Sequence, residues 1–202
     1  MDEKVQTTVA VVDEVPVNRE GMPTPPGVPT PRQSQILKQW VRDVFISVAV
    51  AWFVIAFLFQ QVRVDGTSMQ PGLQDQDRLF INKLVYRFGD MKHGDVVVFL
   101  YPGDHTMSYI KRVIGLPGDD VRVDHGHVFV NGAELVEPYV AAQFQDDRSA
   151  AETVVPAGEV YVMGDHRSIS SDSRVFGPVD RKLIYGKATY VFWPIRDSGS
   201  VR

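Results

Sequence analysis

The chain has 202 residues with 21 basic and 25 acidic side chains, a formal net charge of −4 and no cysteine. This length allows one domain of moderate size together with a tail or an anchor. The charge gives no reason to expect nucleic-acid binding. The absence of cysteine excludes a disulfide framework, a thiol nucleophile and a thiolate metal site. Of the five histidines only His125 and His127 are close in sequence, and they lie in a segment typical of a hairpin turn, so we expect no metal.

Residues 1–38 form a proline-rich tail. Six of the 13 prolines lie between Pro16 and Pro31, among Thr and Gly residues. Such a segment buries too little apolar surface to offset the entropy lost on ordering, so we expect it to be disordered. A proline-rich docking ligand is the alternative interpretation.

Residues 44–59 are all apolar except Ser47, and the run extends to Val62 through Gln60 and Gln61. As a helix it would be about 28 Å long, close to the ~30 Å hydrocarbon core of a bilayer. A core helix would show a polar stripe, and a cleaved signal peptide would begin near the N-terminus and end in small residues. The sequence therefore predicts an uncleaved transmembrane helix over residues 39–62.

Basic residues set the expected orientation of this helix. Arg32, Lys38 and Arg42 precede the apolar run, whereas only Arg63 follows it within fifteen residues. This bias predicts a cytoplasmic N-terminus and an exported C-terminal domain.

Residues 63–202 contain short alternating or β-branched runs bounded by turn residues, which predict strands. The turn signals include Pro117-Gly118-Asp119 and Asn131-Gly132. This spacing predicts a mainly β fold, an antiparallel β-sheet domain with little helix. The polar composition around residues 139–153 predicts a loop insertion. The expected strands span residues 78–86, 95–101, 109–116, 120–124, 127–130, 159–163 and 187–193.

Two separate segments offer the parts of one catalytic pair. Ser68 lies in a turn framed by glycine and proline, and Lys111 lies in an apolar, strand-like run. A serine hydroxyl needs a base near neutral pH, and a lysine serves as that base only when an apolar site keeps it neutral. A Ser–Lys pair is a known variant of the serine-nucleophile arrangement. A third segment, residues 164–177, gathers hydroxyls and opposite charges. Each segment alone is also compatible with an ordinary turn, an edge strand or a surface loop.

Together and in this order after an apolar run, the three segments resemble the type I signal peptidases over residues 40–194. The resemblance implies a membrane-bound serine endopeptidase that removes signal peptides from exported preproteins, cutting after small-x-small (Ala-x-Ala-like) sites. It implies a catalytic domain on the outer face of a plasma membrane, bacterial in origin, and no metal or organic cofactor. The implied partners are preprotein substrates and the lipid bilayer, with the secretion machinery as a further one.

The resemblance also implies a role for individual residues. Ser68 matches the nucleophile that forms an acyl-enzyme, Lys111 matches the general base, and Ser170 matches a serine that orients the lysine amine. We expect Asp172 to pair with an arginine, Arg174 before others, because a carboxylate directly on Lys111 would raise its pKa. The residues matched to supporting ion pairs are Asp165, Asp172, Arg167 and Arg174, and Arg112 follows the lysine as in the family.

Three positions depart from the family pattern. Gly72 stands where threonine is usual, His166 where asparagine is usual, and Gly66 where some members have a serine whose hydroxyl helps to bind the oxyanion. The Ser68 backbone N–H remains one oxyanion donor, and we expect the second from the backbone near Gly66. Met69 is expected to shape the substrate cleft. Further apolar residues are candidates for lining pockets or for touching lipid: Phe59, Leu73, Ile110, Val113 and Phe176.

Two other classes of protein stay open at this point. A self-cleaving repressor-type Ser–Lys protease would carry a DNA-binding helical module before the protease part, where this chain has a proline-rich tail and an apolar run. A non-catalytic, membrane-tethered β domain would be expected to lose the serine, the lysine or the third segment, and all three are present. Substitution of Ser68 separates an enzyme from a binding module.

Overall fold

The computed structural model describes residues 33–201, without the side chains of residues 33–34 and 55–59. The disordered tail predicted for residues 1–38 therefore lies almost wholly outside the described residues. The chain divides into two compact units, Met1–Val48 and Ala49–Arg202.

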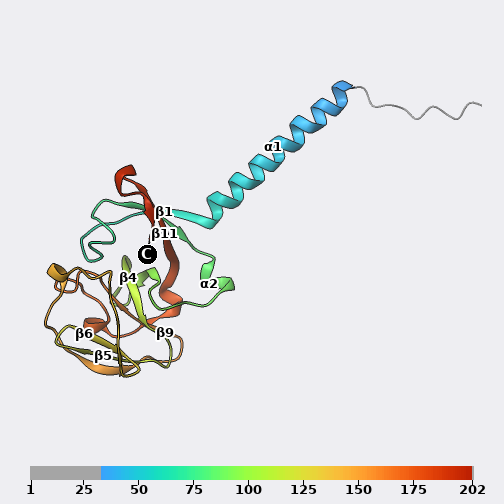
Figure 1. Cartoon of the computed structure of the whole chain (residues 1–202). Helices are drawn as coiled ribbons and strands as arrows, with labels where there is room; N and C mark the ends of the chain where they lie inside the picture. The colour runs from blue at the N-terminus through green and yellow to red at the C-terminus, as the bar shows by residue number, and fades with distance from the viewer. Residues whose placement is uncertain (1–32, 202) are drawn as a thin grey trace, which may run out of the picture. The chain divides into compact units, whose positions relative to one another are not determined.

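Helix α1 spans Gln33–Leu58 and contains most of the apolar run (Figure 1). Its described aromatic side chains, such as Trp40 and Phe45, are largely exposed. No helix in residues 33–201 has both the length and the apolar composition needed to span a bilayer. Residues 59–62, which we expected to continue the helix, belong to strand β1 (Phe59–Arg63), which pairs with β2.

The larger sheet of the described chain has eight strands in the order β1-β2-β11-β3-β4-β9-β10, with β12 paired to β11. Every strand pair recorded in residues 33–201 is antiparallel, which confirms the predicted mainly β, antiparallel domain. Besides β1, the strands of this sheet are β2 (Arg78–Asn82), β3 (Val96–Tyr101), β4 (Asp104–Gly115), β9 (Glu159–Met163), β10 (Val179–Asp180), β11 (Ile184–Trp193) and β12 (Gly199–Ser200).

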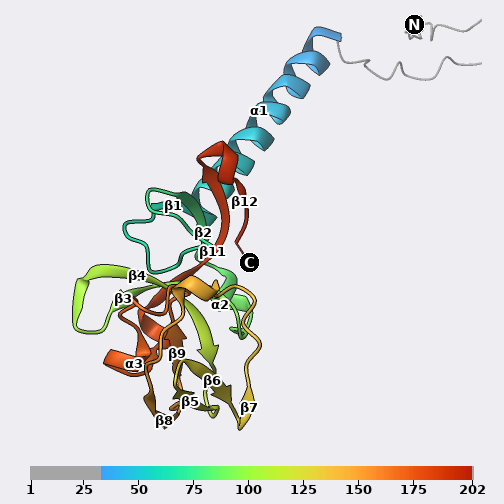
Figure 2. The ribbon, with the colours of Figure 1, turned by 60° about the vertical axis from the view of Figure 1, so that its left-hand side comes forward.

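A smaller sheet, in the order β7-β6-β5-β8, lies at the end of the domain opposite β1 and β2 (Figures 1 and 2). The predicted hairpin turn at His125 is confirmed, because Asp124 pairs with His127 and both turn residues have positive φ. The strands of this sheet are β5 (Asp120–Asp124), β6 (His127–Val130), β7 (Ala133–Glu134) and β8 (Ala150–Val154).

Two predicted segments differ from the structure. The strand expected over residues 78–86 ends at Asn82, because the Asn82 side-chain oxygen accepts hydrogen bonds from the N–H groups of Leu84 and Val85 and starts a helix instead. The loop expected over residues 139–153 includes a helical turn and the first part of β8. The short helices are α2 (Val85–Phe88), α3 (Ser173–Phe176), η1 (Ala142–Phe144), η2 (Arg181–Leu183) and η3 (Ile195–Asp197).

The core explains why the central strands are apolar without interruption. Strand β3 (VVVFLY) lies between β11 and β4, and its first four side chains are buried. By contrast β5 (DVRVD) buries only alternate residues, as a strand with one covered face does. Leu73 and Val113 are fully buried core residues. Neither belongs to the lining of the cleft at Ser68, and neither has surface for contact with lipid, contrary to the two uses that we considered for them.

Candidate active site

Ser68 lies in the connection between β1 and β2. The ends of this connection are joined by backbone hydrogen bonds between Val64 and residues 76 and 77. The side chains of Met69 and Leu73 are buried in the core beside it. The turn is therefore fixed from beneath by packing and at its base by backbone bonds, which leaves the serine hydroxyl free to face β4.

Lys111 lies on β4, directly opposite Val97 of β3. Its Nζ donates a hydrogen bond to Ser68 Oγ at 2.7 Å and to the carbonyl oxygen of Ile110 at 3.1 Å. Only 4% of the lysine is exposed. The two segments that were expected to supply a serine and a lysine thus meet at hydrogen-bond distance, although 43 residues separate them in sequence.

Burial lowers the pKa of Lys111 from its ordinary value to about 8, because the ammonium form loses its hydration. The negative charges of Asp172 and Asp165 oppose this shift, and the positive charge of Arg174 assists it. A substantial fraction of the amine is therefore neutral at mildly alkaline pH. In that form its lone pair can accept the Ser68 proton along the existing hydrogen bond.

The ion pair expected between Asp172 and Arg174 is confirmed. Arg174 donates from Nε and from NH2 to the two oxygens of Asp172, at 2.8 and 2.9 Å. Burial alone would raise the pKa of Asp172, but the hydrogen bonds and charge of Arg174 bring it below its ordinary value. Asp172 also accepts the Gly164 N–H at 3.1 Å. The carboxylate with the strongest electrostatic effect on Lys111 is therefore ionised and already paired with a different cation.

The other two arginines of the predicted set also pair with acids. Arg112 makes two hydrogen bonds to Asp165, at 2.9 and 2.6 Å, in a fully buried contact. Burial raises the pKa of Asp165, and the Arg112 hydrogen bonds oppose that rise. Arg167 donates to Glu137 at 2.7 and 2.5 Å and to the Gly164 carbonyl at 3.0 Å. These buried pairs hold the third segment rigidly beside Lys111.

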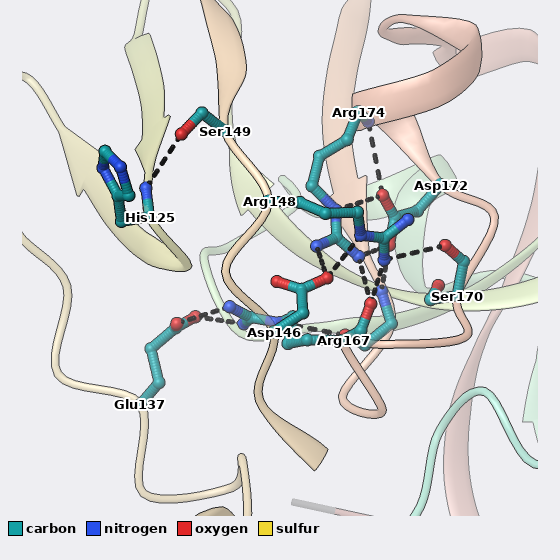
Figure 3. A network of polar contacts seen from close by, with 10 residues as sticks. His125, Glu137, Asp146, Arg148, Ser149, Arg167, Ser170, Asp172 and Arg174 are labelled. Atoms are coloured by element: carbon teal, nitrogen blue, oxygen red, sulfur yellow. Dashed lines mark hydrogen bonds and ion pairs between the residues drawn. The ribbon is translucent and has the colours of Figure 1, made fainter.

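Sequence reasoning missed the acid and the arginine that the segment predicted as a loop supplies, Asp146 and Arg148 (Figure 3). Asp146 accepts a hydrogen bond from Arg174 at 3.0 Å and another from Arg148. Arg148 and Arg174 both donate to the carbonyl oxygen of Arg167. The run Asp146-Asp147-Arg148 was visible as a charged cluster, but its partners lie 19 to 28 residues away and no spacing rule identifies them.

Within residues 33–201, no hydrogen bond is recorded between Ser170 and the lysine amine. The buried Ser170 hydroxyl interacts with Asp172 instead and helps to lower the pKa of that carboxylate. It packs against Gly164, where an added Cβ would lie 2.3 Å from Ser170 Oγ and 2.5 Å from the Ser68 carbonyl oxygen. The third segment therefore approaches the serine turn by close backbone packing that only glycine permits. The amine itself is aimed by Ser68 and by the carbonyl of Ile110.

The second oxyanion donor expected near Gly66 is also corrected. The Gly66 N–H donates to the Asp75 carboxylate at 2.8 Å, so it is not free to bind an oxyanion. This bond lowers the pKa of Asp75 below its ordinary value. Within residues 33–201, no recorded acceptor takes the Ser68 N–H. It is therefore a donor that the serine turn leaves open directly beside the hydroxyl.

A cleft of about 480 Å³ opens beside Ser68 and Lys111. Met69 and Ile110 line it, as expected, while Phe176 belongs to an aromatic cluster with Phe99, Tyr101 and Tyr109. The side chain of Phe59 lies outside the described residues. In residues 33–201, no group of three His, Cys, Asp or Glu side chains is placed to hold a metal ion. The cleft lining is Val62, Arg63, Val64, Asp65, Gly66, Thr67, Ser68, Met69, Val98, Ser108, Tyr109, Ile110, Lys111, Ile169 and Ser171.

Comparison with known proteins identifies the family. The family described as signal peptidase, peptidase S26, matches residues 37–193, which include the serine turn, the lysine strand and the third segment. The chain belongs to this family. Signal peptidase I of Bacillus licheniformis is 39% identical over 175 residues, covering 80% of this chain and 91% of that one. Signal peptidase IB of Staphylococcus aureus is 32% identical over 177 residues, covering 80% and 92%.

A solved structure of the family is also similar. A signal peptidase I from Enterococcus faecalis V583 is 30% identical with a TM-score of 0.44, and the match covers 48% of this chain and 96% of that one. The identity to curated relatives over most of the chain makes this protein a peptidase of the signal peptidase I type. The remaining question is how its own residues carry out peptide hydrolysis.

Proposed function

We propose that the chain is a membrane-bound endopeptidase that removes signal peptides from exported preproteins with a Ser68–Lys111 dyad. One observation carries the proposal: a buried lysine whose pKa is lowered to about 8 lies 2.7 Å from a serine hydroxyl at the wall of a cleft. Membership of the signal peptidase family supports the substrate class.

The proposed reaction begins with neutral Lys111. Its Nζ takes the Ser68 proton as Oγ attacks the scissile carbonyl carbon, and the ammonium then gives that proton to the leaving amine when the peptide C–N bond breaks. The resulting ester joins Ser68 to the signal peptide. Lys111, neutral again, takes a proton from a water molecule whose oxygen attacks the ester carbonyl, and the proton returns to Ser68 as the acid product leaves.

The substrate is proposed to bind as an extended peptide in the cleft. Within residues 33–201, β1 pairs with β2 alone, and β9 pairs with β4 from Arg112 onward. The strand edges at residues 62–63 and 108–111 therefore both keep unpaired backbone groups where they line the cleft. An added strand would hydrogen-bond to these edges and leave alternate side chains to set specificity. The Ser68 N–H is proposed as the first oxyanion donor.

The membrane attachment is proposed from the sequence. The apolar run of residues 44–59 and the basic residues before it support a single anchor with a cytoplasmic N-terminus and an exported catalytic domain. Preproteins at the outer face, and the secretion machinery that delivers them, are the proposed partners. Extraction of membranes at alkaline pH tests the attachment: an anchored chain stays in the pellet, and release into the supernatant contradicts the anchor.

Cleavage of a preprotein with an Ala-x-Ala site tests the proposed function. Detergent-solubilised full-length protein should cut after the final alanine, whereas Ser68→Ala and Lys111→Arg should be inactive but folded. Arginine fails because its guanidinium stays protonated and cannot act as a base. Ser198→Ala and Lys182→Met alter an exposed serine and an exposed lysine, and they should cut like the unmodified protein.

Two results would overturn the proposal. Cleavage by Ser68→Ala at the unmodified rate would exclude Ser68 as the nucleophile. Failure of the unmodified protein to cut any Ala-x-Ala preprotein would favour the alternative of a membrane-tethered β domain with a binding role.

A further inference from the structure

His166 joins the third segment to the serine turn by two contacts. Its backbone N–H donates to the Ser68 carbonyl oxygen at 3.1 Å, and its imidazole Nδ1 lies 3.3 Å from the Thr67 carbonyl oxygen. His166 therefore binds the carbonyl of the nucleophile, Ser68, and the carbonyl of the preceding residue, Thr67. His166 is half-buried and makes no contact with Lys111 that the structure records.

The chemistry of the second contact determines where the imidazole carries a proton. A carbonyl oxygen can only accept a hydrogen bond, so Nδ1 must be the donor. This requirement is met by the neutral tautomer with hydrogen on Nδ1 and also by the imidazolium.

The Thr67 carbonyl and the Ser68 N–H belong to the same peptide group. That group is planar and trans, so its C=O and N–H point in opposite directions along fixed lines. Holding the carbonyl oxygen fixes the direction of the N–H on the other side. That N–H belongs to the nucleophile itself and has no recorded acceptor in residues 33–201.

Different segments hold this peptide and the backbone before it. Asp75 holds the Gly66 N–H, two peptide groups earlier, and His166 holds the carbonyl of the peptide itself. The Thr67 carbonyl accepts two recorded hydrogen bonds in the described residues. One comes from the Gln70 N–H, which belongs to the serine turn, and the other comes from His166, which lies outside it. The imidazole is thus the external restraint on the rotation of this peptide.

The imidazole is itself restrained by the segment that sequence reasoning treated as a loop. The ring of Phe144 lies 4.1 Å from the His166 ring between centroids, and the Phe144 carbonyl accepts the Ser168 N–H at 3.2 Å. Phe144 ends the helical turn η1, and Asp146 two residues later bonds Arg174. The same short segment therefore holds both the histidine ring and the arginine network.

We propose that His166, held by Phe144, is a positioning residue that orients the Ser68 N–H towards the oxyanion formed in the reaction. This inference rests on the proposed function, since it assigns the Ser68 N–H a role in peptide hydrolysis. The restraint acts on the transition state and not on the bound substrate. Its loss therefore lowers kcat and leaves KM nearly unchanged.

Two substitutions of the same shape separate the hydrogen bond from packing. In His166→Asn the amide nitrogen is bonded to Cγ, as Nδ1 is in histidine, so it can donate to the Thr67 carbonyl from nearly the same place. In His166→Leu a methyl group occupies that place and donates nothing. His127→Leu is the matched control, because His127 is exposed on β6 and bonds only Glu134 in the described residues.

The test measures kcat and KM for one preprotein, with thermal unfolding of every variant. We expect His166→Leu to lose about tenfold in kcat, roughly 1.4 kcal/mol of transition-state stabilisation, with KM within twofold. His166→Asn should stay within threefold of the unmodified protein, and His127→Leu should match it. Phe144→Leu should lower kcat about threefold, because the imidazole is retained but less restrained.

Several outcomes would overturn the inference. Full kcat in His166→Leu, an equal loss in His166→Asn, or a rise in KM without a fall in kcat would each do so. If His166→Leu does not fold, His166→Asp takes its place, since it presents an acceptor oxygen where Asn presents a donor. Equal kcat for His166→Asp and His166→Asn at pH 9.5 would then refute the inference. If the unmodified protein cleaves and Ser68→Ala does not, any such failure concerns His166 alone.

Discussion

Replacing Lys111 with methionine should change the stability of the protein in a pH-dependent way. Lowering the lysine pKa from 10.5 to about 8 corresponds to about 3 kcal/mol, at 1.36 kcal/mol per pKa unit. Below pH 8 this difference lowers the free energy of unfolding by about 3 kcal/mol, because the ammonium form of Lys111 is disfavoured by burial in the folded state and not in the unfolded state. Methionine removes that penalty, and it also removes two hydrogen bonds worth about 1 kcal/mol each.

The sign of the pH effect follows from proton binding. Between pH 8 and 10.5 the unfolded state binds more protons at this position than the folded state, so the stability of the unmodified protein rises with pH through this window. Lys111→Met lacks this contribution. We therefore expect the variant to be more stable by about 1 kcal/mol at pH 7 and less stable by about 2 kcal/mol near pH 10.5.

Guanidinium chloride unfolding of both full-length proteins in the same detergent, at pH 7, 8, 9 and 10, measures this difference. All other titrating groups are common to the two proteins, so their contributions cancel in the comparison. A difference in unfolding free energy that stays constant across these pH values would refute the reasoning, because it would show that Lys111 has an ordinary pKa in the folded protein.

Two further predictions concern the neighbours of the dyad. Asp172→Asn should move the acidic limb of the pH–rate profile to lower pH, because it removes the charge that raises the Lys111 pKa most; an unchanged or higher limb would contradict this coupling. Gly164→Ala should lower kcat by about 100-fold and unfold at lower temperature, since the new Cβ must displace the Ser68 backbone. Near-normal turnover with normal thermal stability would show that the two segments are not closely packed.

Strands could be predicted where a run of alternating or β-branched side chains is bounded by turn residues. Strands β5, β6 and β9 occupy the predicted residues, because alternating or β-branched side chains are bounded there by glycine-containing turns. Strand β8 was not predicted, since it is a polar strand whose side chains are mostly exposed and which carries no apolar alternation. Its pairing with β5 depends on backbone hydrogen bonds, which leave no signature in side-chain composition.

The candidate site was predictable as a set of residue types but not as a set of contacts. Burial of the strand around Lys111 could be predicted from its apolar neighbours, and so could the direction of the pKa change. The orientation of Ser170 could not be predicted, because it depends on backbone packing between distant segments. The acceptor of the Gly66 N–H could not be predicted either, because it depends on how the connection between β1 and β2 folds back on itself. Arg167 pairs with Glu137 and Arg174 pairs with Asp146. These residues are far apart in sequence and come into contact only in the folded chain.

The central claim is that a neutral, buried Lys111 activates Ser68. The most direct test is kcat/KM for one preprotein from pH 6 to pH 10, which reports the titration of the free enzyme. The account predicts that kcat/KM rises with pH through an apparent pKa of about 8 and then levels off. A profile that is flat across this range, or one that still rises in proportion to hydroxide at pH 10, would contradict it.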